Sequence, residues 1–120
     1  MRAESRKTPL ADQVRHLLEM APAAILPMTY QQLAAALGLT PPRTIQRVAL
    51  ALETLMREDV AAGRPLIAAL VVSRRGDLPR PGFFELAVAL ERFPPEPAHH
   101  EAAYRQELAR VMALRPRTAG

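Results

Sequence analysis

The stretch that decides the fold runs from Thr29 to Ala62 and reads TYQQLAAALGLTPPRTIQRVALALETLMREDVAA. Thr29 and Gln32 have the spacing of a capping box, in which the threonine oxygen accepts a hydrogen bond from an unpaired backbone amide and the glutamine side chain bonds back to the cap. A helix is therefore predicted to begin at Tyr30. Gly38 can adopt the left-handed conformation that ends such a helix, so this helix should span about two turns.

A second helix is predicted to follow, with Thr40 as its cap and Pro41 and Pro42 at its first positions. Proline is tolerated there because the amides it lacks would have no partner within the helix. The buried stripe of this helix would comprise Ile45, Val48, Ala49, Leu52, Leu55 and Met56. Gly63 should end it, and the acidic Glu53, Glu58 and Asp59 should lie away from any phosphate. Two helices joined by a tight turn indicate a helix-turn-helix, which places the start of its second helix in the major groove of DNA.

The outward positions of this unit carry polar and basic side chains. The candidate DNA contacts are Tyr30, Gln31, Arg43, Thr44, Gln46 and Arg47. Arginine pairs with guanine edges or with phosphate, glutamine pairs with adenine, and the helix dipole adds positive potential at the N-terminal end. No acidic residue lies between Arg43 and Arg47. The alternatives are an ordinary solvated helix face for the arginines and a core or hinge role for Tyr30.

A second basic cluster follows a predicted buried strand. Leu66 to Ser73 has the length and the β-branched content of a strand, and the loop from Arg74 to Gly82 comes directly after it. This loop carries Arg74, Arg75 and Arg80 among glycines and prolines. After a helix-turn-helix and a strand, such a loop has the position of a wing, which contacts phosphates or enters the minor groove.

The remaining segments predict further helices around this centre. Residues 8–20 should form a helix with Leu10, Val14, Leu17 and Leu18 inside and with Asp12, Arg15 and Glu19 outside. Residues 24–28 are short, apolar and interrupted by Pro27, which favours an edge strand. Residues 83–93 alternate like a strand, but their Ala, Leu and Glu content favours a helix. Residues 99–114 predict a final helix with Tyr104, Leu108, Val111 and Met112 inside.

The length of 120 residues and an apolar fraction of 49% suit one domain with a modest core. We expect a flexible basic arm at 1–7, a single domain at 8–114 and a flexible tail at 115–120. The fold class should be mainly α with a small β-sheet, as a winged helix-turn-helix with extra N- and C-terminal helices. No segment has the features of a signal peptide or a membrane span, so we expect a cytoplasmic, nucleoid-associated protein.

Composition and spacing argue against catalysis. The chain has no cysteine, so thiolate chemistry and disulfides are excluded. His99, His100 and Glu101 are not a good metal site, because adjacent side chains on a helix point about 100° apart. No Ser, His and Asp set, paired carboxylates or Gly-rich phosphate loop stands out. We therefore predict no enzymatic activity, no metal and no cofactor.

The net charge of +4 comes almost wholly from arginine, which binds phosphates and base edges better than lysine does.

The segment Thr-Tyr-Gln-Gln-Leu-Ala, which begins at Thr29, resembles the helix-turn-helix of the methylated-DNA protein cysteine methyltransferases and of the alkyltransferase-like proteins. The resemblance covers a little under half of the chain and continues loosely through residues 43–50, 65–72, Gly76 and Gly82-Phe83. In that family a tyrosine and an arginine at these places assist nucleotide flipping. The resemblance therefore implies DNA contact through Tyr30 and Arg43.

The departures from that family exclude alkyl transfer. The alkyl-accepting Pro-Cys-His-Arg is missing, and the place of its cysteine falls at Ala68. The segment from Glu53 to Arg64 is also longer than the family's link, which would disturb the pocket that receives a flipped base. The resemblance thus supports a winged-helix architecture more than lesion recognition.

Three functions from different classes follow. The first is a non-enzymatic winged-helix protein that binds double-stranded DNA, most simply a transcription regulator. As a homodimer it would associate through the terminal helices, residues 9–20 and 99–114. The second is an alkyltransferase-like DNA-lesion binder. The third is an adaptor that keeps the winged-helix shape but binds protein.

Overall fold

The computed structural model describes residues 9–114. Within this range the fold is mainly helical with a small sheet, as the sequence predicted. The helices are α1 (Pro9–Met20), α2 (Tyr30–Ala36), α3 (Thr44–Ala62), α4 (Pro81–Ala89) and α5 (His100–Ala113). Short 3₁₀ turns are η2 (Ala23–Ile25), η3 (Ile67–Leu70) and η4 (Pro97–His99), and the strands are β1 (Met28–Thr29) and β2 (Val71–Val72).

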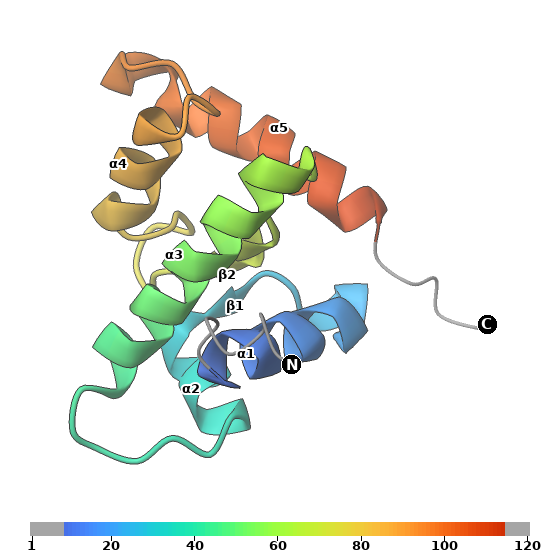
Figure 1. The fold of residues 1–120 in the computed structure, drawn as a ribbon, viewed down its shortest axis with the longest axis vertical. Coiled ribbons are helices and arrows are strands. Elements are labelled where there is room, and N and C mark those ends of the chain that lie inside the picture. The colour runs from blue at the N-terminus through green and yellow to red at the C-terminus, as the bar shows by residue number, and fades with distance from the viewer. Residues whose placement is uncertain (1–8, 115–120) are drawn as a thin grey trace.

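Helix α3 is the centre of the arrangement (Figure 1). Helices α1, α2 and α4 pack against it, as does η3, and α5 packs against η3. The first turns of α3, together with the link from α2, project at the end of the molecule opposite α4 and the α4–α5 connection (Figure 1). The start of α3 is therefore distant from α4 and from the α4–α5 connection.

The predicted start of α2 is confirmed. Thr29 Oγ1 accepts a hydrogen bond from the Gln32 amide at 3.0 Å, and Gln32 Oε1 accepts one from the Thr29 amide at 2.9 Å. Tyr30 and Leu33 on its inner face are buried. Gly38 follows the helix with φ of 71°, the left-handed conformation that a side chain would make costly.

Helix α3 begins later than predicted. It starts at Thr44, and its N-terminal cap is Arg43 with φ of 62°. The prediction of a start at Pro41 was wrong because Thr40 and Pro41 each precede a proline, and the residue before proline is disfavoured in the helical region. Residues 37–43 therefore form a longer link than the tight turn expected. The predicted end is confirmed, since Gly63 caps α3 with φ of 72°.

The predicted strand over residues 66–73 is largely replaced by the 3₁₀ turn η3. Only β2 is extended, and it pairs in parallel with β1 through Met28 opposite Val71 and Thr29 opposite Val72. The earlier edge strand is likewise reduced to β1, because residues 23–25 form η2. In residues 9–114, β2 has no antiparallel partner that would make the loop after it a wing hairpin. A winged helix is thus not established.

Buried side-chain contacts explain why residues 66–70 do not continue the sheet. Asp59 Oδ2 accepts the Ile67 amide at 2.9 Å, and Glu107 Oε2 accepts the Leu66 amide at 2.7 Å. The Tyr104 hydroxyl donates to the Ala69 carbonyl at 2.8 Å. Side chains from α3 and α5 therefore satisfy backbone groups that a sheet ladder would otherwise pair.

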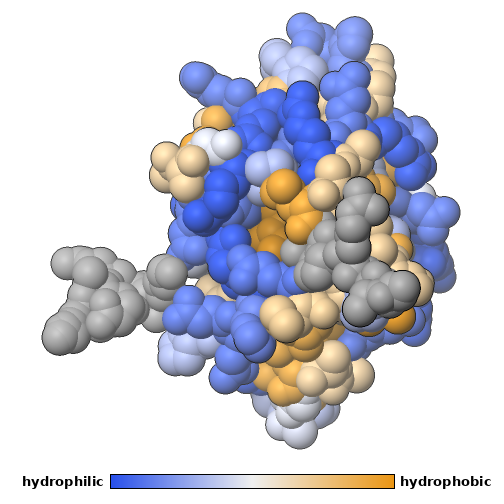
Figure 2. All heavy atoms as spheres, turned by 90° about the vertical axis from the view of Figure 1, so that its right-hand side faces the viewer, coloured by the Kyte–Doolittle hydropathy of each residue, from blue (hydrophilic) through white to orange (hydrophobic). Residues whose placement is uncertain are grey.

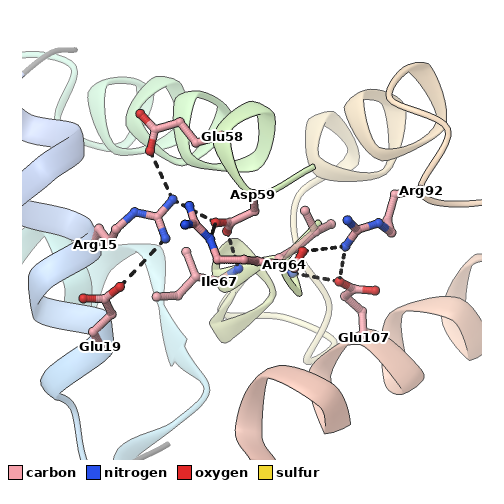
Figure 3. A network of polar contacts seen from close by, with 9 residues as sticks. Arg15, Glu19, Glu58, Asp59, Arg64, Ile67, Arg92 and Glu107 are labelled. Carbon is pink, nitrogen blue, oxygen red and sulfur yellow. Dashed lines mark hydrogen bonds and ion pairs between the residues drawn. The ribbon is translucent and has the colours of Figure 1, made fainter. Parts of the chain in front are cut away.

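Two buried carboxylates anchor this junction (Figure 3). Asp59 lies 2.9 Å from Arg15 Nη2 and 3.0 Å from Arg64 Nε, and Glu107 lies 2.7 Å from Arg92 Nη1. Arg15 had been expected on the outside of α1, and that expectation was wrong, because Asp59 supplies the partner that lets its charge be largely buried. Asp59 had been expected to lie away from any phosphate, and this stays a prediction.

The face at the right of Figure 1 is mainly hydrophilic, and its polar residues surround a small apolar hollow (Figure 2). A pocket of about 340 Å³ is lined by Arg15, Asp59 and Arg64, together with Ile67 from η3 and Val111 from α5. The ion pairs of Asp59 therefore lie beside this pocket rather than in a sealed interior.

The last two helices agree with the sequence. Residues 83–93, which could have been a strand, belong mostly to α4, and α5 matches the predicted final helix. Phe83 packs edge-on against Phe93 and Tyr104, with ring centroids 5.8 and 6.1 Å apart, so α4 and α5 share an aromatic core.

The arm predicted at 1–7, the start of the first helix at Thr8 and the tail predicted at 115–120 lie outside the described residues. None of the helices between Pro9 and Leu114 is long and apolar enough to cross a membrane. Dimerisation through the terminal helices stays a prediction.

Candidate nucleic-acid interface

The end of the molecule formed by α2, the 37–43 link and the start of α3 carries most of the predicted contacts. Four of them are exposed, namely Gln31, Arg43, Gln46 and Arg47, whereas Thr44 is half-buried and Tyr30 is buried. Arg47 Nη1 donates to the Thr40 carbonyl at 3.3 Å, so this guanidinium also supports the link. Arg43 and Arg47 thus belong to one surface that a polyanion could approach.

This end is free of negative side chains. No Asp or Glu occurs between Glu19 and Glu53, a stretch that contains Arg43 and Arg47. The N-terminal end of α3 adds the partial positive charge of its unpaired amides. The charged side chains of α2, the 37–43 link and the first turn of α3 are therefore all positive, in a chain whose net charge is only +4.

The second basic cluster lies in the loop between β2 and α4. Arg74 and Arg75 are exposed, and the loop is closed by a hydrogen bond from the Ser73 amide to the Leu78 carbonyl at 2.8 Å. Gly76 and Asp77 take left-handed conformations, which turn the chain back toward α4. The loop lies beside the middle of α3, whereas Arg43 and Arg47 lie at its start (Figure 1).

Arg80, at the end of this loop, is brought directly to α2. Its backbone amide donates to the Tyr30 hydroxyl at 2.9 Å, and its Cζ lies 5.8 Å from the centre of the Tyr30 ring. Burial raises the pKa of the Tyr30 phenol, and the hydrogen bond from Arg80 partly opposes that rise. Tyr30 is thus a buried link between the two basic clusters rather than an exposed contact.

A pocket of about 280 Å³ opens at this link, between α3 and the start of α4. Its lining residues are Tyr30, Ala49, Leu52, Glu53, Met56, Ala68, Arg80, Pro81, Gly82 and Phe83. Ala68 therefore shares a pocket with Tyr30. The expectation that the longer segment after Glu53 disturbs a pocket for a flipped base stays a prediction.

Glu53 is a residue of this pocket that the sequence did not indicate. It had been expected to lie away from any phosphate, which stays a prediction, and it is half-buried in the pocket wall, where Oε2 would lie 3.8 Å from a Cβ added to Gly82. It makes no ion pair or hydrogen bond within residues 9–114. Its spacing of four from Ala49 and three from Met56 was the available signal, since these positions share a helix face.

The histidines at the start of α5 have structural contacts. His100 stacks on Phe84 with ring centroids 5.5 Å apart and planes at 7°, and its Nε2 lies 2.8 Å from the Pro94 carbonyl oxygen. Residues 9–114 contain no group of three His, Asp or Glu side chains placed to hold a metal ion. His100 therefore joins α4 to α5.

Comparison of the chain with protein-family models, with curated proteins and with solved structures finds no match. A function must therefore be inferred from the surface and pockets just described.

Proposed function

We propose that this protein binds double-stranded DNA, catalyses no reaction and acts as a transcription regulator. The observation that supports this best is the exposed, acid-free end that carries Arg43 and Arg47 before and within the first turn of α3. In this proposal the start of α3 reads the major groove, with Gln46 and Arg47 toward base edges. Arg74 and Arg75, on a loop in the position of a wing, contact phosphates.

The test is duplex binding measured by fluorescence anisotropy over a range of salt concentrations. Neutralising several phosphates makes affinity fall steeply with salt, by a slope of about 0.9 for each phosphate contact. Arg43→Ala and Arg74→Ala should each weaken binding, and the loss of one phosphate contact should reduce the slope by about one. Arg105→Ala, on the exposed side of α5, is the matched control. Binding that is absent, or equally insensitive to all three changes, would contradict the proposal.

Selection of bound fragments from random DNA separates a regulator from a non-specific binder. A regulator should enrich one sequence whose base pairs contribute about 1–3 kcal/mol each. Gln46→Ala should then relax the preference at one position without changing the salt slope.

A second candidate, an alkyltransferase-like lesion binder without catalysis, is favoured by one observation. The pocket that contains Tyr30 and Ala68 lies beside α3, where a modified base could enter from bound DNA. Duplexes with and without an alkylated guanine distinguish the two functions. Tighter binding of the alkylated duplex, lost in Ala49→Leu because the longer side chain fills the pocket, would favour the lesion binder. Equal affinity for both duplexes would reject it.

A further inference from the structure

A separate groove of about 730 Å³ lies along α4, on the side of the connection to α5. Its lining residues are Leu78, Pro79, Pro81, Phe84, Glu85, Val88, Pro95, Pro97, His100 and Glu101. It shares only Pro81 with the pocket beside α3. It therefore needs an explanation of its own.

The floor of the groove is rigid. Phe84 is stacked on His100 and packs edge-on against Phe83 and Tyr104, with ring centroids 5.3 and 6.3 Å apart. Four of the lining residues are prolines, whose φ is fixed by the ring. A surface of this kind loses little conformational freedom when something binds, which favours affinity.

The charged residues that line the groove are both acidic. Its two charged lining residues, Glu85 and Glu101, are both exposed. Glu101 pairs with Arg105 at 3.4 Å, but both side chains are more than half exposed, so the pair is weak and exchangeable. Residues 77–101 contain five acidic residues and two arginines, and Arg92 is already bound to Glu107 and to the Arg64 carbonyl.

This surface would repel a phosphate backbone, and it lies at the other end of the molecule from the start of α3 (Figure 1). An apolar lining with one carboxylate from α4 and one from α5 suits a peptide that inserts an apolar side chain and places cationic side chains near it. We propose that the α4–α5 groove docks a segment of a partner protein with an apolar anchor flanked by arginine or lysine. The protein would then have one surface for DNA and another for a protein partner.

The test uses the whole chain and a phage-displayed library of random peptides. Wild-type protein should enrich peptides that combine an apolar centre with flanking Arg or Lys, and the most enriched peptide is then synthesised and labelled for anisotropy. The charge-reversed variant Glu85→Lys/Glu101→Lys should bind it at least about tenfold more weakly, because two attractions become repulsions. The matched control, Glu91→Lys/Glu96→Lys, changes the net charge equally at exposed positions outside the groove and should stay within about twofold.

Three outcomes would overturn the inference. The first is enrichment of no common sequence, or of sequences without basic residues. The second is equal weakening in both variants, which would indicate a non-specific charge effect. The third is self-association of the wild type that the Glu85/Glu101 variant abolishes, which would assign the groove to a second copy of the chain. Salt-dependent DNA binding by the same proteins is measured separately, so failure of the DNA proposal is distinguishable from failure of this one.

Discussion

Asp59 is a buried carboxylate that joins three segments of the chain at the α3–η3 junction. It is fully buried, and its oxygens contact Arg15, Arg64 and the Ile67 amide. A buried charge is tolerated only when it is paired and hydrogen-bonded. These contacts hold the end of α3, α1 and η3 in one arrangement.

Asp59→Ala should lower the free energy of unfolding by about 3–5 kcal/mol, because the buried Ile67 amide loses its acceptor and Arg15 loses its shortest ion pair, keeping only Glu58 and Glu19. Urea denaturation measures the change. Glu19→Ala is the control, since Glu19 is half exposed and 3.9 Å from Arg15 and should contribute less than about 1 kcal/mol. Similar losses in both variants would show that burial of Asp59 has no special role.

The burial of Tyr104 predicts that the stability of the protein falls with rising pH in the alkaline range. Burial raises the pKa of its phenol to about 12, whereas an unfolded tyrosine ionises near about 10. The folded state therefore binds the proton more tightly, so this stabilisation is complete below about pH 10 and is lost as pH rises toward about 12.

Tyr104→Phe should remove the contribution of Tyr104 to that alkaline loss. It should also cost about 1–3 kcal/mol at neutral pH, because the buried Ala69 carbonyl loses its donor. Urea denaturation at a series of pH values measures both effects. The pKa of Tyr30 is raised as well, so Tyr30→Phe is the comparison variant. An unchanged pH profile in Tyr104→Phe would reject the assignment.

Among the elements, α3 and α4 each have a glycine at one end. Replacing these two glycines by alanine should change the stability of the protein in opposite directions. Gly82 lies in the first turn of α4, and an added Cβ would meet only Glu53 Oε2 at 3.8 Å. Gly82→Ala should therefore stabilise the protein by up to about 1 kcal/mol. Gly63→Ala should destabilise it by about 1–2 kcal/mol, because φ is 72° there. Thermal unfolding measures both, and changes of the same sign would contradict the prediction.

Elements that are determined by neighbouring residues could be predicted from the sequence. The Thr29 cap, the end of α3 at Gly63 and the final helix depend on residues within a few positions of one another. The segment 66–70 was not, because its conformation depends on Asp59, Tyr104 and Glu107, which are 8, 35 and 41 residues from the backbone groups they bind. An apolar, β-branched run carries no information about such distant partners.

For the whole molecule, the sequence indicated which arginines are exposed but not how the surfaces are assembled. Exposure of Arg43, Arg47, Arg74 and Arg75 follows from local polarity. The pocket at Tyr30 and the α4–α5 groove were not predicted, because each combines segments brought together only by folding. Glu53 illustrates this limit, since its charge gave no indication of the pocket wall in which it lies.

The distribution of charge predicts that the affinity for duplex DNA depends on where the arginines lie more than on the net charge of the chain. Arg43→Gln/Arg47→Gln and Arg105→Gln/Arg110→Gln each remove two positive charges from a chain of net +4. Only the first pair should weaken duplex binding substantially, because exposed charges more than about 10 Å from a phosphate are screened at 0.1 M salt. Anisotropy at fixed ionic strength measures this. Equal weakening by both pairs would mean that DNA is held by overall charge alone.

The dependence of residues 66–69 on α5 also has a consequence for biosynthesis. A ribosome releases α1, α2 and α3 before the residues that pair the Leu66 amide and the Ala69 carbonyl have been translated. Until Tyr104 and Glu107 emerge, those two backbone groups lack the side-chain partners that they have in the folded protein, and Arg92 has only the Arg64 carbonyl. The packing of residues 66–69 therefore cannot be completed before α5 has been translated.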